Sequence, residues 1–391
     1  MKDKIILVSK DVFMRGYLPV YGNKYWKTPN IDELASKGTV FMKHYTAAPS
    51  TAMSFTSMFT GLYAYETDRK KYTEVSEFEA DTFFDKLYQK GYSCHVVWDK
   101  SYVHLAQRYS KCYGKHTTIH NTDFLTRAQP PHQKGEYDDM TFFPELEEEC
   151  FKKMEALTQE IAGSTDKVFM WIHFPHVLLG RNSYGSDIDL TDRMIGMFRK
   201  YFDDDAIFIT ADHGHMNGTH GKYGYGFDVN EQAIKIPLIT PRINNLEVVD
   251  FPTSNTQIQD IIMGKLEKRD VVFSETAYYQ QPHRKIAVIK GKYKYIYEKA
   301  TKKEYLFDVD WDYSENINLL ETEIFDLDRK KYYSVMQRFF YPHWNDGLPQ
   351  IASELRAEKD KLWRNAPFLI EMKERIIQFA RRIKMRFFEK F

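Results

Sequence analysis

Three separate segments carry side chains that can bind a divalent metal ion and activate a nucleophile. Asp11 and the pair Asp212-His213 each follow an apolar run, and Thr51 precedes a helix-compatible stretch at residues 52–59. Two carboxylates, an imidazole and a threonine oxygen suit Zn²⁺ or, with added water, Ca²⁺, Mg²⁺ or Mn²⁺. A bound divalent ion lowers the pKa of a ligating water from 15.7 to about 7 and should act similarly on a hydroxyl. We therefore expect Thr51 to be a metal ligand and a nucleophile, the alternative being a threonine that only caps its helix.

Histidines gather in the segment DHGHMNGTH at residues 212–220. Clusters of Asp and His mark metal sites, so we interpret this segment as part of the same site; the alternative is a surface loop with incidental histidines. His176 follows an apolar strand and a proline, which places it at the same rim as His220 or leaves it an ordinary loop residue. Weaker candidates for binding a substrate anion, each of which can equally be an ordinary surface residue, are Lys100, His104, His215 and Lys222.

Composition excludes several classes of protein. The 391 residues include 55 Lys plus Arg and 55 Asp plus Glu, so net charge gives no argument for nucleic-acid binding. Three widely spaced cysteines suggest neither a disulfide framework nor a zinc knuckle, and they favour a reducing compartment. We find no apolar run of 18 residues and no signal-peptide core. We expect a cytoplasmic protein that can also lie peripherally on the inner face of the membrane.

Strands and helices alternate through the first 241 residues, which predicts an α/β fold with a doubly wound, mostly parallel sheet sandwiched by helices. The candidate residues follow strands, and ligands of such sheets bind at the carboxyl ends of the strands. The segment at residues 101–140 loses periodicity and is expected to be an irregular insertion beside a substrate cleft. Predicted strands cover residues 4–9, 39–45, 92–98, 167–174, 206–210 and 234–240, and predicted helices cover residues 31–37, 52–59, 81–90, 144–162 and 190–202.

In the C-terminal part the alternation of strands and helices ends. Residues 285–299 predict two strands with a turn at Gly291, and residues 305–308 predict a third, which indicates a small antiparallel α+β subdomain. We place the catalytic domain at residues 1–270, this subdomain at 271–320 and a helical tail at 321–391.

The tail ends in a basic amphipathic helix over residues 368–391, where apolar residues recur at steps of three and four with Lys and Arg between them. Such a helix can lie on an anionic membrane surface, or it can pack its apolar stripe on the protein body or on a partner chain.

An ordered series of motifs resembles the sulfatase branch of the alkaline phosphatase superfamily. The resemblance spans about residues 4–320 and includes the TG pair at residues 60–61, nine residues after Thr51. The other motifs are YG at 21–22, TPNIDELASKGTVF at 28–41, PH at 175–176, ADHGHMNGTHGK at 211–222, KIPLIT at 235–240, KGKYKYIYEK at 290–299 and EYLFDVDWDYSENINLL at 304–320.

The resemblance implies an alkaline phosphatase-like fold and assigns roles residue by residue. It implies that Asp11, Asp212 and His213 bind a metal and that Thr51 becomes covalently modified. His220 and His176 match positions that bind substrate, protonate the leaving group or hold a second metal ion.

The nucleophile segment departs from the sulfatase pattern. Sulfatases carry a cysteine or serine, matured to formylglycine, within C/S-x-P-S-R, whereas this chain has T-A-M-S-F with Met53 for Pro and Phe55 for the anion-binding Arg. Lys10 also stands where sulfatases tend to have a second aspartate before Asp11. Thr51 instead resembles the nucleophile of the phosphoethanolamine transferases and lipoteichoic acid synthases.

Those enzymes take a head group from a phospholipid onto threonine and pass it to a sugar or polyol. The leading hypothesis is therefore a metal-dependent phosphotransferase or phosphodiesterase with a covalent Thr51 intermediate, a phospholipid or phosphodiester donor, and a glycan or polyol acceptor. One alternative is a sulfatase that works without formylglycine. Another is an inactive relative that binds glycan or lipid as a scaffold.

Overall fold

The computed structural model describes residues 1–63, 66, 81–100, 113, 116–125, 144–175, 178, 187–276, 284–320 and 348–365. His104, His176, the predicted amphipathic helix at 368–391 and most of the predicted insertion at 101–140 lie outside these residues. Within them, no helix combines the length and apolar character that crossing a membrane requires.

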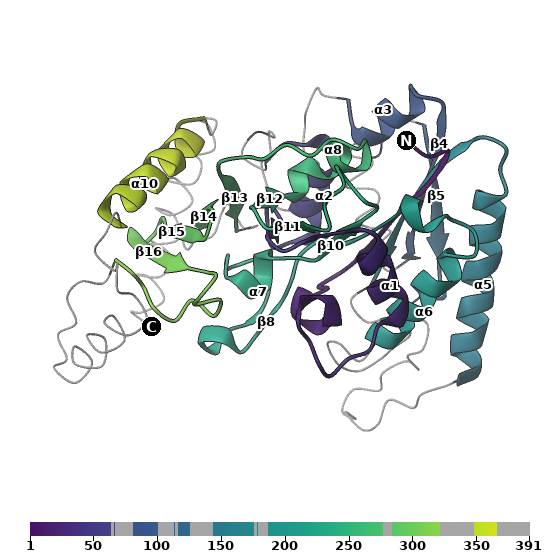
Figure 1. Ribbon diagram of the computed structural model, residues 1–391, viewed down its shortest axis with the longest axis horizontal. Coiled ribbons are helices and arrows are strands. Elements are labelled where there is room, and N and C mark those ends of the chain that lie inside the picture. Colours follow the sequence, from purple (N-terminus) through teal and green to yellow (C-terminus); the bar gives the residue numbers. More distant parts are fainter. Residues whose placement is uncertain are drawn as a thin grey trace, which may run out of the picture.

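An eight-stranded sheet forms the centre of the larger part of the molecule (Figure 1). Five consecutive strands of this sheet are parallel, and the strand next to them is antiparallel to both of its neighbours. This mostly parallel sheet confirms the predicted fold class. In spatial order the strands are β11 (Val248–Val249), β2 (Thr39–Phe41), β10 (Leu238–Thr240), β7 (Ile207–Ala211), β1 (Lys4–Lys10), β6 (Lys167–Phe174), β4 (Tyr92–Asp99) and β5 (Thr117–Thr122).

Helices cover both faces of this sheet, which is why its central strands carry apolar residues on both faces. Ile6 and Val8 of β1 belong to the core beneath one set of helices, and Ile5 and Leu7 belong to the core beneath the other. The first set is α1 (Pro29–Lys37), α5 (Pro144–Ala162) and α6 (Ile188–Phe198); the second is α2 (Thr51–Thr60), α3 (Phe83–Tyr88) and α8 (Ile258–Ile262). The chain is thus a three-layer α/β sandwich with β1 near its middle.

Two strand predictions were wrong in extent. The sequence predicts one strand over residues 39–45, but the chain changes partners after Met42 and forms β2 and then β3 (His44–Tyr45), which pairs with β12 (Thr253–Ser254). The predicted strand at 234–240 begins only after Pro237, because proline has no N–H to donate to a ladder. Residues before it form the short helix α7 (Glu231–Ile234).

Strand β5 was missed altogether and lies inside the predicted irregular insertion. Its sequence TTIHNT is polar and mostly exposed because β5 is the edge strand, so it lacks the apolar run that reveals its buried neighbours.

The C-terminal sheet is antiparallel, as predicted, and has α10 (Leu348–Asn365) on one face (Figure 1). Its other face packs on residues of the larger part, including α7. The hairpin turns at Gly291, whose φ of +60° favours glycine. The strands are β13 (Val272–Glu275), β14 (Lys285–Lys290), β15 (Tyr293–Glu298) and β16 (Lys303–Asp308); a separate ribbon joins β8 (Met216–Asn217) to β9 (Tyr223–Gly224).

A buried ion network joins the two parts. Lys294 of β15 is fully buried, and its Nζ lies 2.7 Å from Glu315 Oε1 and 3.2 Å from Glu231 Oε1 of α7. Lys235 Nζ binds the other oxygen of Glu231 at 2.9 Å. Removing one partner of such a network leaves a buried charge without compensation, so its integrity is required for the two parts to stay packed.

We expect Lys294→Met to lower the free energy of unfolding by about 3–5 kcal/mol, because it leaves the buried Glu315 carboxylate without its ammonium partner and leaves Glu231 with Lys235 alone. Denaturant titration at neutral pH measures the change. The matched control is Lys292→Met, just before the same strand, where the lysine pairs with the buried Asp308 but is itself half exposed. Because water screens this lysine, its removal should cost less than that of Lys294. Equal losses in both variants would contradict the importance of the network.

The same network makes stability depend on pH. Burial, opposed by the Lys294 ammonium and assisted by the nearby Glu231 carboxylate, raises the pKa of Glu315 from 4.5 to about 7. The folded state therefore binds more protons than the unfolded state between these values, and stability falls as pH rises through them. The stability difference between wild type and Glu315→Gln should decline from pH 4.5 to 7 and stay level above.

Glu304→Gln is the contrasting variant for that pH series. The Arg356 guanidinium hydrogen-bonds Glu304 and lowers the pKa of its carboxyl, so the contribution of Glu304 should be present above pH 4.5 and disappear at lower pH. If the two variants gave pH profiles of the same sign, the assignment for Glu315 would be wrong.

Candidate active site

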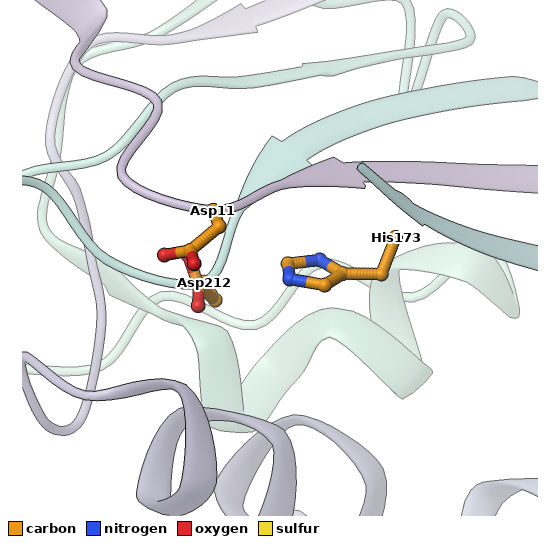
Figure 2. A group of neighbouring side chains, drawn as sticks. All are labelled: Asp11, His173 and Asp212. Atoms are coloured by element: carbon orange, nitrogen blue, oxygen red, sulfur yellow. The ribbon is translucent and has the colours of Figure 1, made fainter. Parts of the chain in front are cut away.

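The carboxyl ends of three neighbouring parallel strands bring two carboxylates and an imidazole together. Asp11 follows β1, His173 lies near the end of β6, and Asp212 follows β7. One ligand atom from each of the three lies within 4.8 Å of the others, and all three side chains are buried. Figure 2 shows the two carboxylates side by side with the His173 ring pointing toward them.

His213 adds a second imidazole to this group. Its Nδ1 lies 2.8 Å from the Gly214 carbonyl oxygen, which can only accept a hydrogen bond, so the tautomer of the neutral ring carries its proton on Nδ1 and its lone pair on Nε2. Nε2 lies 3.6 Å from Asp11 Oδ1, 3.5 Å from Asp212 Oδ2 and 3.2 Å from Thr51 Oγ1. Asp11, Thr51, Asp212 and His213, predicted from four separate positions in the sequence, therefore meet.

Thr51 is the first residue of α2 and not its N-cap. Ser50 occupies the N-cap position, with extended backbone angles and no side-chain capping bond. Ser54 fixes the helix to the segment that carries Asp212, because its Oγ donates to the Asp212 carbonyl at 2.6 Å and accepts from Asn255 Nδ2 at 2.9 Å. Thr51 Oγ1 is thereby held against His213 and does not satisfy its own helix end.

The two carboxylates occupy an environment that disfavours their charge. Burial raises the pKa of Asp212, and the Asp11 carboxylate raises it further. Asp212 Oδ1 accepts hydrogen bonds from the amides of His213 at 2.7 Å and Val12 at 3.2 Å. Val12 has a φ of +50°, a conformation that costs a β-branched residue about 1–3 kcal/mol. Backbone strain is thus tolerated where it directs an amide at this carboxylate.

These residues fit a divalent metal ion. The site combines two buried carboxylates, an imidazole whose Nε2 lone pair is oriented by a backbone carbonyl, and a hydroxyl, with 3.2–3.6 Å between His213 Nε2 and the three oxygens. Such spacings match donor atoms that share an ion at about 2.0–2.2 Å. The ion would offset the charge repulsion that raises the pKa of Asp212. The donor set therefore fits a divalent metal ion by its chemistry.

His173 was missed in the sequence. Burial lowers its pKa to about 3, so the ring is neutral. The signal was a single histidine near the carboxyl end of an otherwise apolar run, KVFMWIHF, at the rim where Asp11 and Asp212 were expected. The sequence indicated His176 of the following PH motif instead.

Two predicted anion-binding residues that the structure describes, Lys100 and His215, have other contacts. Lys100 follows β4 and is exposed, with its ammonium 3.6 Å from Asp123. His215 Nδ1 lies 2.8 Å from Asn217 Oδ1. Neither is placed against the carboxylates, and their roles stay predictions.

His220 and Lys222 do not belong to the carboxylate cluster but line a separate cavity of about 280 Å³, between the segment after β8 and the C-terminal sheet. His220 Nε2 donates to the Ser314 carbonyl at 2.9 Å, and Lys222 forms an ion pair with the buried Asp228, which also binds Lys285. The expected role of His220 in catalysis therefore requires that it leave Ser314, and it stays untested.

Comparison with known proteins relates this chain to sulfatases. The Sulfatase family model matches residues 3–243, more than half of the chain. Human arylsulfatase D is 29% identical over 137 residues, which cover 32% of this chain and 23% of the relative. An arylsulfatase of Clostridium perfringens is 34% identical over 98 residues, which cover 25% of this chain and 20% of the relative. These matches thus span about a fifth of the length of the curated relatives.

Solved structures share the fold over nearly the whole chain. A 2-O GAG sulfatase superimposes with a TM-score of 0.62 at 12% identity, covering 90% of this chain and 94% of that one. A phosphonate monoester hydrolase of Agrobacterium radiobacter superimposes with a TM-score of 0.61 at 15% identity, covering 91% and 96%. The family match, the shared fold and the converging acidic residues agree, and the chain belongs to the sulfatase family of the alkaline phosphatase superfamily.

Proposed function

We propose that this chain hydrolyses a sulfuric ester with Thr51 as a direct nucleophile and without formylglycine. The observation that carries the proposal is the position of Thr51 Oγ1, 3.2 Å from His213 Nε2 at the carboxylate pair. Arylsulfatases among the sequence relatives support the sulfate ester as substrate class. The divalent ion held by Asp11, Asp212 and His213 would supply positive charge that favours the Thr51 alkoxide and neutralises the transferring group.

The reaction would proceed as a double displacement. Thr51 Oγ1 forms a bond to sulfur, the ester S–O bond breaks, and the proton lost by Thr51 balances the proton gained by the leaving alcohol. Water then cleaves the Thr51 sulfate ester, which restores the hydroxyl and releases hydrogen sulfate. We propose His176 and His220 as proton carriers, His220 only after its bond to Ser314 has opened.

The second candidate is phosphoryl transfer through the same Thr51, either to water or from a phospholipid or phosphodiester donor to a glycan or polyol. It is favoured by the threonine itself and by the structural likeness to a phosphonate monoester hydrolase. Phe55 lies where sulfatases place an arginine, and its ring packs against Trp171 and His173. Because this position provides no cation, the site suits esters with one negative charge, which describes both a sulfate ester and a phosphodiester.

Metal binding should stabilise the fold, because an ion bound only by the folded state adds about 2.7 kcal/mol at a concentration of 100 Kd. We expect chelator-treated protein to gain in Tm on addition of Zn²⁺ or Mn²⁺, and Asp212→Asn to lose most of that gain. Asp204→Asn, on the surface in the Arg199 ion pair, should keep it. A wild-type Tm that no divalent ion changes would exclude the metal site.

Thr51→Ala should reduce turnover of the preferred substrate at least about 1,000-fold, as removal of a nucleophile does. The measurement compares an aryl sulfate with an aryl phosphodiester, using metal-loaded wild type, Thr51→Ala and Thr51→Ser, which keeps a hydroxyl. Thr56→Ala is the matched control, since this threonine is also buried in α2 and its hydroxyl donates to the Ala52 carbonyl of the same helix at 2.9 Å.

The preferred ester decides between the two candidates. Faster turnover of the phosphodiester, with an adduct on Thr51 by intact mass, would replace the sulfatase proposal by phosphoryl transfer. Activity that survives Thr51→Ala would refute both. Metal-loaded wild type that turns over neither ester would favour the glycan- or lipid-binding scaffold.

A further inference from the structure

His173 lies where a metal ligand would lie, although nothing in the motifs points to it. It is fully buried at the end of β6, the strand that pairs with β1, and Ser9 of β1 is its register partner. Its ligand nitrogen, one oxygen of Asp11 and one of Asp212 all lie within 4.8 Å of one another. The Phe55 ring packs edge-on against the imidazole with centroids 4.7 Å apart, which restricts its rotation.

Ser9 determines which way the imidazole presents its nitrogens. Ser9 Oγ lies 2.9 Å from His173 Nδ1, accepts from Trp171 Nε1 at 2.8 Å, and donates to the Ile172 carbonyl at 3.4 Å. A hydroxyl has one proton and two lone pairs. When the Ser9 hydroxyl donates its hydrogen bond to the Ile172 carbonyl, its oxygen accepts from Trp171 Nε1 and from His173 Nδ1. His173 Nε2 then presents a lone pair toward the carboxylates.

We propose that His173 is a ligand of the metal ion through Nε2, oriented by Ser9, so that the site holds two imidazoles and two carboxylates. The proposal rests on the metal site of the proposed function but not on which ester is hydrolysed. A histidine that binds a metal through one ring nitrogen ordinarily donates a hydrogen bond from the N–H of the other. The Gly214 carbonyl would accept this bond from His213, and the Ser9 hydroxyl would accept it from His173.

This donor set selects among metal ions. Imidazole nitrogen suits Zn²⁺ and other transition metals, whereas Ca²⁺ and Mg²⁺ prefer sites built from oxygen. Lys10, next to Asp11, does not oppose a cation, because its ammonium is bound by Asp187 Oδ2 at 2.6 Å and the Pro175 carbonyl at 2.8 Å. The site is therefore a transition-metal site, with Zn²⁺ as the probe of choice.

X-ray absorption of the Zn²⁺-loaded wild-type chain tests the proposal without any mutation, because it counts imidazole ligands. Two imidazoles are expected in wild type and one in His173→Gln. In competition titrations with a chelating dye, Ser9→Ala should raise the Kd for Zn²⁺ by about 10–100-fold, the usual effect of losing an outer hydrogen-bond partner, and His173→Gln should raise it further. The Kd for Ca²⁺ should change by less than about 10-fold in both variants.

His44→Gln is the matched control. His44 is equally buried, its pKa is also lowered to about 3 by burial, and its Nδ1 contacts the Thr253 hydroxyl at 2.9 Å on a neighbouring strand. This variant should lose stability as His173→Gln does and leave the Kd for Zn²⁺ unchanged.

The outcomes separate this proposal from the proposed function. One imidazole in Zn²⁺-loaded wild type would overturn the role of His173 and leave the metal site intact. Failure of wild type to bind any divalent ion would overturn the metal site itself. If His173→Gln does not fold, the ligand count in wild type and the Kd of Ser9→Ala still decide the question.

Discussion

The repulsion between Asp11 and Asp212 is the constraint on which the rest of the site depends. Both carboxylates are buried at the ends of adjacent strands, with an oxygen of one within 4.8 Å of an oxygen of the other. Like charges at such distances repel by about 3–4 kcal/mol at an effective dielectric of about 20. Backbone groups around Asp212 partly compensate for this repulsion. Two backbone amides are directed at one oxygen of Asp212, one of them from a strained Val12. A divalent cation bound between the two carboxylates would remove this repulsion. The arrangement that is unfavourable without an ion therefore favours binding of a cation.

The nucleophile is positioned by the same construction. Ser54 fastens α2 to the carbonyl of Asp212, so the helix that carries Thr51 and the strand that carries the acid move together. Phe55 of the same helix packs on the other side, against His173 and Trp171. One helical turn therefore connects the hydroxyl, the carboxylate and the buried imidazole, and a small shift of α2 would disturb all three.

The sequence was sufficient for the fold class and for four members of the cluster, because apolar strands with polar residues at their carboxyl ends carry a clear pattern. It was insufficient where tertiary context decides. The edge position of β5 removes its apolar run, and the change of partners after Met42 leaves no mark in composition. His173 looked like one residue of an apolar strand, because only pairing with Ser9 and proximity to Asp11 give it a possible role. The displacement of His220 and Lys222 into another cavity reflects contacts with the C-terminal sheet, which no local motif encodes.

Asp187 also makes a contact with consequences for how such a site can diversify. Its Oδ2 accepts from the Lys10 ammonium at the end of β1 at 2.6 Å and from the Leu178 amide at 2.9 Å, so the charge of Lys10 is compensated beside Asp11. Exchanging Asp187 for a neutral residue would leave the Lys10 ammonium without this carboxylate, so the charge beside Asp11 can change through a residue that is not among the donors.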